Sequence, residues 1–505
     1  MQASSIWTQS VRNVPTFAKL QGSVPRVDVA VVGAGIVGLS TALSLKEQGK
    51  RVAVLEGGSV GRGISAFTTA KLSSLHSLCY TKLMKEVGLE GIRAYADFNE
   101  RGIDYVERNV TKYAIDCDFE RVPNYTFTFH GDMVSTIATE VEAAKAAGLA
   151  ASFTQETDLP FPVRAAIRVE NQAQFNSYAY CLGLARAVQG EGCDVYEHSR
   201  VQTVSEASPH RVVTEDGSIE ADYVVLATHL PILDRSNHFA FCKPVQSFCM
   251  ACTLEDNSKM PRAMYITAET TPTLSVRSAN NGTVLVVAGG GTNMGEFPSN
   301  NSELLYKDLE ELAREHFPIK DVVSRWSGED YMPADSIPYI GYLYRGTKSI
   351  FTATGMKKWG LAHGSAAGML IADLIDGKEN REWHHLYDAR RWHLMSSLPN
   401  LAKFQAKVGA HFVGDRAKHI AKVPDIEELV NDTGAVCKYR GKLVAAYRDP
   451  EGRMHAVSPT CTHLGCHLRW NQGDRAWDCP CHGSRFSVKG EVIHGPAVKK
   501  LESYL

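Results

Sequence analysis

Cysteine and histidine residues that could bind a metal cluster gather near the C-terminus in two short motifs, Cys461-Thr-His463-Leu-Gly-Cys466 and Cys479-Pro-Cys481-His482-Gly-Ser484. The spacing of the donors is C-x-H-x15-C-x-x-H. Two thiolates and two imidazoles suit a [2Fe–2S] centre in which histidines replace the cysteines on one iron. Zinc is the competing metal for such pairs, although the two additional cysteines and the Cys-His-Gly-Ser ending favour the iron–sulfur centre.

These motifs resemble the Rieske iron–sulfur family over about residues 426–505. The resemblance implies four cluster ligands, with Cys461 and Cys479 on one iron and His463 and His482 on the other. It also implies a disulfide between Cys466 and Cys481, as in respiratory and photosynthetic members. Ser484 matches a hydroxyl that donates a hydrogen bond to a cluster sulfide and raises the reduction potential. High-potential relatives add a tyrosine two residues later, where this chain has Phe486, so we expect an intermediate potential.

A glycine-rich loop near the N-terminus could bind the pyrophosphate of a dinucleotide. The β-branched run 27–32 predicts a buried strand, and Gly33-x-Gly35-x-x-Gly38 follows it at the start of a helix predicted over 36–48. The glycines allow a tight turn, close approach of backbone to pyrophosphate, and packing of the helix on the strand. A second predicted strand, 51–55, ends at Glu56, whose carboxylate could bind ribose hydroxyls. Together these features predict a dinucleotide-binding βαβ unit.

Further motifs make the chain similar to the D-amino-acid oxidase superfamily of flavoproteins over about residues 25–380. They are the stretches 62–71, 222–228, 335–341 and 354–364. The resemblance implies FAD as the dinucleotide and a set of cofactor-binding residues: Arg62, Ser65, Thr68, Thr69, Ala70, Lys71, Thr228, Gly355, Lys358, Trp359, Gly360 and Leu361. We expect non-covalent FAD, because the centre of the stretch 65–68 offers neither histidine nor cysteine. A second glycine turn, 289–291, opens no second βαβ unit, which disfavours binding of NAD(P)H.

The helices and strands expected around these motifs indicate the fold class. It is an α/β FAD-binding Rossmann-like domain with an inserted antiparallel-sheet α+β substrate domain, plus a C-terminal all-β Rieske domain. The predicted boundaries are 1–24 for an N-terminal extension, 25–380 for the oxidoreductase, 381–425 for linker helices and 426–505 for the Rieske domain. Within 25–380, we expect FAD-binding segments at about 25–90, 170–240 and 325–380. The substrate domain is expected to comprise about 91–169 and 241–324, with antiparallel strands at 243–254, 262–267, 273–278 and 283–288.

Composition excludes several classes of function. The chain has 54 basic and 56 acidic residues and no strongly basic block, so nucleic acid is not expected as a partner. No run of about 18 apolar residues is present, so no transmembrane segment is predicted. The first 20 residues lack the apolar centre of a secretory signal, which predicts a cytoplasmic protein.

A flavin accepts two electrons together, whereas a Rieske cluster accepts one at a time. The combination predicts a FAD-dependent dehydrogenase that oxidises an amine or amino-acid-like substrate by hydride transfer and passes electrons singly through the cluster to an external acceptor, a protein or a quinone. Candidate catalytic residues are Lys71, near the expected flavin face, and Arg277, which could hold a substrate carboxylate. The alternatives are an electron-transfer reductase component and an oxygen-using amine oxidase with a regulatory cluster.

Overall fold

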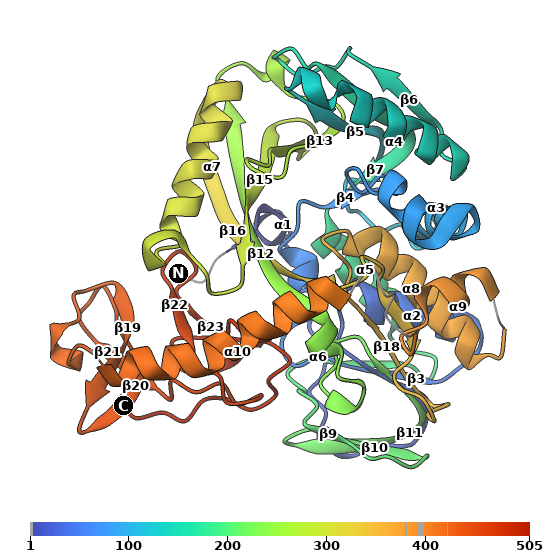
Figure 1. Ribbon diagram of the computed structural model, residues 1–505. Helices are drawn as coiled ribbons and strands as arrows, with labels where there is room; N and C mark the ends of the chain where they lie inside the picture. The colour runs from blue at the N-terminus through green and yellow to red at the C-terminus, as the bar shows by residue number, and fades with distance from the viewer. Residues whose placement is uncertain (1–3, 379–380, 392–397, 422) are drawn as a thin grey trace.

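The computed structural model describes residues 4–378, 381–391, 398–421 and 423–505, which form two large sheets and two small ones (Figure 1). Parts of three predicted segments lie outside the described residues. These parts are residues 1–3 of the N-terminal extension, 379–380 at the end of the oxidoreductase segment, and 392–397 and 422 of the linker.

The first sheet is nine-stranded and contains the glycine-rich loop at the end of its central strand. Its parallel neighbours are, in order, β18 (Ile350–Thr354), β11 (Gly217–Leu226), β2 (Val27–Val32), β3 (Val52–Leu55) and β8 (Asp194–Tyr196). The other members are β17 (Tyr339–Tyr342), antiparallel to β18, and the short strands β1 (Gly22–Ser23), β9 (Thr203–Val204) and β10 (His210–Val213). The β2 strand is apolar on both faces because its neighbours and the covering helices bury it.

Three helices cover this sheet, α2 (Ile36–Glu47), α5 (Ser177–Val188) and α8 (Gly360–Ile375). The α2 and α8 helices approach closely because α8 presents glycine at the contact. A Cβ atom on Gly368 would lie 2.6 Å from the Cβ of Ser40, and one on Gly364 would lie 2.9 Å from Ile36. The two helices that start nearest the predicted pyrophosphate site are therefore fixed against each other.

The second sheet is also nine-stranded. Its path is β16 (Ile319–Pro333), β12 (Cys242–Leu254), β15 (Val284–Asn293), β14 (Ser275–Ala279), β13 (Met264–Thr267), β5 (Glu120–Thr128), β7 (Ala165–Gln174) and β4 (Lys71–Leu72), with β6 (Ala151–Thr154) on β7. The sheet is antiparallel except where β13 meets β5. Outer helices are α3 (Tyr80–Lys112), α4 (Val134–Ala146) and α7 (Glu303–His316). The predicted fold class is confirmed.

Two strands of this sheet differ from the sequence-based expectation. The β7 strand continues beyond residue 169 and the β16 strand beyond residue 324, so both run across boundaries predicted between the substrate and FAD-binding segments. In addition, no strand was predicted at the position of β5. Both β7 and β16 carry many charged and polar residues, and the burial of β16 alternates irregularly along its length. Such a strand lacks the regular apolar pattern on which strand prediction depends.

The small C-terminal part is all β, as predicted. One sheet contains β19 (Thr433–Tyr439), β20 (Lys442–Arg448) and β21 (Met454–Val457), and the other contains β22 (Arg469–Asn471), β23 (Ala476–Asp478), β24 (Arg485–Phe486) and β25 (Val492–His494). The remaining helices are α1 (Ile6–Ser10), α6 (His238–Phe241), α9 (Arg381–Tyr387) and α10 (Leu398–Ala421). None of the described helices combines the length and the apolar character that crossing a membrane requires.

The α10 helix runs between the small β part and the rest of the molecule (Figure 1). Gln405 donates a hydrogen bond to the Ala240 carbonyl, at 2.5 Å, and Lys407 pairs with Glu296 at 2.6 Å. Burial would raise the pKa of Glu296, but hydrogen bonds from Asn293, Lys407 and His411 lower it to about 2. The ionised carboxylate thus ties α10 to the turn after β15.

A buried ion network joins the small β part to the second sheet. The Arg485 guanidinium on β24 bonds to Asp474 at 2.7 Å and Asp478 at 2.8 Å within the small part, and to Glu329 of β16 at 3.1 Å. All four side chains are at least nine-tenths buried. Burial would lower the pKa of Arg485, but the three carboxylates raise it well above its usual value. A buried cation in this position must keep its partners.

Replacing the Arg485 cation tests how much the buried ion network contributes to the stability of the protein. We expect Arg485→Gln to lower the free energy of unfolding by about 3–5 kcal/mol, because it leaves buried carboxylates without their counter-charge. Urea unfolding followed by tryptophan fluorescence measures the effect. Arg453→Gln is the matched control, since Arg453 lies in the same small part and pairs with Asp449 while 74% exposed. Equal stability of the two variants would contradict the role given to Arg485.

Candidate functional site

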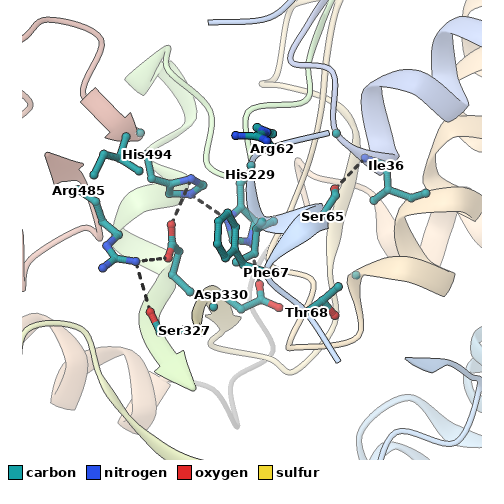
Figure 2. Close-up of a pocket in the computed structure, with 18 of the residues that line it drawn as sticks. Ile36, Arg62, Ser65, Phe67, Thr68, His229, Ser327, Asp330, Arg485 and His494 are labelled. Atoms are coloured by element: carbon teal, nitrogen blue, oxygen red, sulfur yellow. Dashed lines mark hydrogen bonds and ion pairs between the residues drawn. The ribbon is translucent and has the colours of Figure 1, made fainter. Parts of the chain in front are cut away.

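A cavity of about 1000 Å³ lies between the two large sheets and the small β part (Figure 2). Its lining includes the glycine loop, the stretch 62–71, the start of α8, and strands β12 and β15. Residues 491–495 and 497–498 of the small β part complete one wall. Segments that are far apart in the sequence therefore line one cavity.

The glycine loop has little room for side chains. Gly33 adopts a φ of +106°, and a Cβ there would lie 2.5 Å from the Ala227 carbonyl oxygen. A Cβ on Gly38 would lie 1.9 Å from the Gly33 oxygen. The Glu56 carboxylate accepts hydrogen bonds from the N–H groups of Ala34, at 2.8 Å, and Gly58, at 2.7 Å. Such a cradle of backbone and carboxylate fits the pyrophosphate and ribose of a dinucleotide.

Most of the predicted cofactor-binding residues line this cavity: Gly33, Gly35, Glu56, Arg62, Ser65, Thr68, Thr69, Lys71, Thr228, Lys358, Trp359, Gly360 and Leu361. Gly38, Ala70 and Gly355 lie behind the lining, where Gly355 packs on Pro333 and Cys242. The α8 helix begins at Gly360, so its N-terminal N–H groups and positive dipole end lie at the cavity. Ser65 accepts the Ile36 N–H at 3.0 Å and fixes the α2 N-terminus (Figure 2).

Two lysines line the cavity at the second sheet. The Lys71 amine donates hydrogen bonds to the Tyr265 carbonyl, at 2.5 Å, and to Ser275, at 2.7 Å. Burial and the nearby Arg277 cation lower the pKa of Lys71 well below its usual value. The Lys358 amine donates to Ser247 at 2.8 Å, and burial lowers its pKa as well, against the opposing effect of Asp330. No ion pair joins either amine to a carboxylate within the described part of the chain.

Arg277 is not brought to the cavity. Its guanidinium donates hydrogen bonds to the backbone carbonyls of Ala70 at 2.5 Å, Ser278 at 2.8 Å and Phe175 at 3.1 Å, and it lies over the Trp7 ring, 4.9 Å from the centroid. Burial lowers its pKa to about 9. The expectation that Arg277 holds a substrate carboxylate is corrected accordingly, because the side chain on β14 points into the core and ties the sheet to the loop before β4.

The cluster motifs meet at one end of the small β part. Cys461 and Cys479 pack in the same buried cluster, and the rings of His463 and His482 have centroids 5.2 Å apart. The disulfide between Cys466 and Cys481 is formed. Ser484, also buried, accepts the Ala497 N–H at 3.1 Å. Paired thiolates and paired imidazoles on facing loops are the donor set of a [2Fe–2S] centre with two histidine ligands.

Three cavity-lining residues near the small β part, His229, Glu329 and His494, were not identified from the sequence. His229 bonds to Asp330 and to His494, both at 3.0 Å, and His494 pairs with Glu329 at 3.3 Å (Figure 2). Burial lowers the pKa of His494 to about 4. These three residues belong to no sequence motif, so no local pattern marks them as site residues. Their partners come from distant parts of the chain.

Sequence comparison assigns a family to each of the two parts of the chain that meet at this site. Residues 28–374 match the FAD dependent oxidoreductase family, and residues 419–505 match the Rieske [2Fe-2S] domain. The chain belongs to the FAD-dependent oxidoreductase family. The two matches give the chain an FAD-binding domain and a C-terminal Rieske domain. These domains imply FAD and a [2Fe–2S] cluster as cofactors, and both fit the cavity and the donor set described above.

Relatives cover both the whole chain and its flavoprotein part. The Rieske 2Fe-2S iron-sulfur protein YhfW of Bacillus subtilis (strain 168) is 30% identical over 99% of this chain and 97% of its own length. Gamma-glutamylputrescine oxidoreductase of Escherichia coli (strain K12) is 24% identical over 79% of this chain and 92% of its own length. The crystal structure of glycine oxidase from Geobacillus kaustophilus superposes with a TM-score of 0.62 at 18% identity, covering 74% of this chain and all of that one. This last likeness is one of fold.

Gly38→Ala tests the glycine loop. We expect the variant to be purified with most of its FAD lost, because a Cβ at this position collides with the Gly33 oxygen. The flavin-to-protein absorbance ratio measures the loss, and the electron-spin signal of the reduced cluster verifies that the Rieske domain is folded. Gly131→Ala is the control, since nothing lies within 4 Å of its Cβ position. Full FAD content in Gly38→Ala would show that the loop does not hold the cofactor.

The charge of Lys71 can be tested by pH linkage. Because burial lowers its pKa in the folded protein, the unfolded chain binds more protons than the native protein between that pKa and about 10.5. Lys71 therefore makes the free energy of unfolding rise with pH across this window, by up to about 1.4 kcal/mol per pH unit. We expect the stability difference between wild type and Lys71→Met to grow in favour of wild type from pH 7 to pH 10. A difference that is independent of pH would show that Lys71 is charged in the native protein.

Proposed function

We propose that this protein is an FAD-dependent dehydrogenase that oxidises an amine or amino-acid-like substrate and passes the electrons one at a time through its Rieske cluster to an external acceptor, a protein or a quinone. The observation that carries the proposal is the shared cavity, in which residues 491–495 of the Rieske domain form a wall of the space that fits FAD. When bound, FAD takes a hydride from substrate and the cluster carries single electrons. The cytoplasmic location stays a prediction.

The second sheet supports the choice of substrate class. The amines of Lys71 and Lys358 lie on the cavity wall and donate to hydroxyl and carbonyl groups, and neither forms an ion pair with a carboxylate in the described part of the chain, so a substrate carboxylate that entered there could bind them. A neutral Lys71 could also accept the proton that an ammonium substrate must lose before it gives up a hydride. Two of the similar proteins, glycine oxidase and gamma-glutamylputrescine oxidoreductase, are named for substrates that carry an amino group.

The test is an anaerobic screen of the holoprotein. Oxidised protein is mixed with a panel of amino acids and amines, and separately with NADH, while flavin absorbance and the electron-spin signal of the reduced cluster are recorded together. We expect at least one amino compound to bleach the flavin, and the cluster signal to grow afterwards. A Cys479→Ser variant, which lacks one cluster ligand, should still bleach but show no cluster signal.

Two other outcomes would replace the proposal. Bleaching by NADH alone would make the protein a reductase component. Bleaching by an amino compound with no growth of the cluster signal, followed by rapid reoxidation in air, would make it an oxidase with a regulatory cluster.

A further inference from the structure

We infer that Tyr331 is the positioning residue that couples the flavin cavity to the iron–sulfur cluster, through a hydrogen bond from its hydroxyl to the backbone of the cluster ligand His482. This inference rests on the proposed function, in which electrons pass from the cavity to the cluster. It concerns a single side chain on β16 that contacts both regions.

Tyr331 lies directly behind the cavity wall, which its ring contacts through His229. Its neighbour Asp330 lines the cavity and bonds to the His229 imidazole at 3.0 Å and to the backbone N–H of Lys358, both on the same wall. The His229 ring stands edge-on to the Tyr331 ring, with centroids 4.7 Å apart. The phenol is fully buried, at 0% exposure, so water does not separate it from these groups.

The other end of Tyr331 reaches the cluster loop. Its hydroxyl donates to the His482 carbonyl at 3.0 Å, and the Gly495 carbonyl lies 3.4 Å away. Gly483 allows this approach, because a Cβ there would lie 2.9 Å from the Tyr331 oxygen and its φ is +79°. The loop that presents the ligand is therefore shaped to accept a hydroxyl from the other domain.

This contact has two physical consequences. It closes a bonded route from the cavity wall through the ring to the peptide of a cluster ligand, with one hydrogen bond as its only non-covalent step. It also fixes the backbone of a cluster ligand, and outer contacts of this kind tune the reduction potential of a metal centre. The donor of this contact comes from β16, outside the Rieske domain.

Two other aromatic residues at the interface lack this combination of contacts. Phe239 packs against His482, with ring centroids 4.9 Å apart, but it has no hydroxyl to donate to the cluster loop. Tyr306 is nearly as deeply buried as Tyr331 and also crosses the interface, donating to Asp474 at 3.0 Å, but Asp474 is not in a ligand motif. Tyr306 is therefore a matched comparison, with one buried interdomain hydrogen bond that does not touch the cluster loop.

The electron balance is simple. Each oxidised substrate delivers two electrons and a hydrogen nucleus to the flavin. The electrons leave in two separate steps, each of which converts one ferric ion of the cluster to ferrous, and each is then removed by a one-electron acceptor. The protons of the reduced flavin are released to solvent. Tyr331 is neither oxidised nor reduced and only holds the two regions in contact.

The experiment uses holoprotein without substrate. A laser flash generates the 5-deazariboflavin radical, which donates one electron to the flavin, and the absorbance of flavin and cluster then reports transfer between them. We expect Tyr331→Phe to slow this transfer about tenfold, the lower end of the loss of activity that removing an outer contact of a metal ligand causes. We also expect it to shift the reduction potential of the cluster, measured by titration with electron-spin detection. Tyr306→Phe should change neither quantity.

Tyr331→Leu, which removes the ring as well, should slow transfer further, and FAD content and cluster signal are measured for every variant to show that it is folded. Equal transfer rates and potentials in Tyr331→Phe and Tyr306→Phe, with transfer intact in wild type, would overturn the role of Tyr331 and leave the proposed function standing. Absence of transfer in wild type would instead overturn the proposed function.

Discussion

A cation buried between two domains is the constraint on which the rest of this arrangement depends. Arg485 cannot be desolvated without its anions, and those anions come from both sides of the interface, two from the Rieske domain and Glu329 from β16. Well-packed apolar residues often hold an interface at least as strongly as a buried ion network does. The network pairs Arg485 with carboxylates from both sides of the interface, and these pairs hold the Rieske domain in its position against the second sheet.

That position also sets the contacts of three consecutive residues of β16. Glu329 meets Arg485 and His494, Asp330 faces the cavity, and Tyr331 reaches the cluster loop. The first residue thus helps to dock the Rieske domain, the second forms part of the cavity wall, and the third contacts the cluster loop. A strand that alternates its faces can do this only if both domains are held against it. The long β16 strand therefore unites the flavoprotein fold with the Rieske fold.

The parts of this site that could be predicted from sequence are those whose chemistry depends on local spacing. The loop Gly33 to Gly38 and the two cluster motifs are of this kind, and the fold class and the Cys466–Cys481 disulfide followed from the families that these motifs resemble. Arg277 was misplaced because a strand residue has two faces, and nothing nearby in the sequence says which one is buried. The interdomain contacts of Arg485 and Tyr331 could not be found because those partners lie more than a hundred residues away and form no motif.

In this account the Rieske domain stays docked while electrons pass from flavin to cluster. The dependence of the transfer rate on solvent viscosity tests this most directly. The rate of flavin-to-cluster transfer after a flash is measured in wild-type holoprotein as sucrose is added. A docked domain predicts a rate that does not change with solvent viscosity. A rate that falls in proportion to viscosity would mean that the Rieske domain must swing into place, and would contradict the docked arrangement.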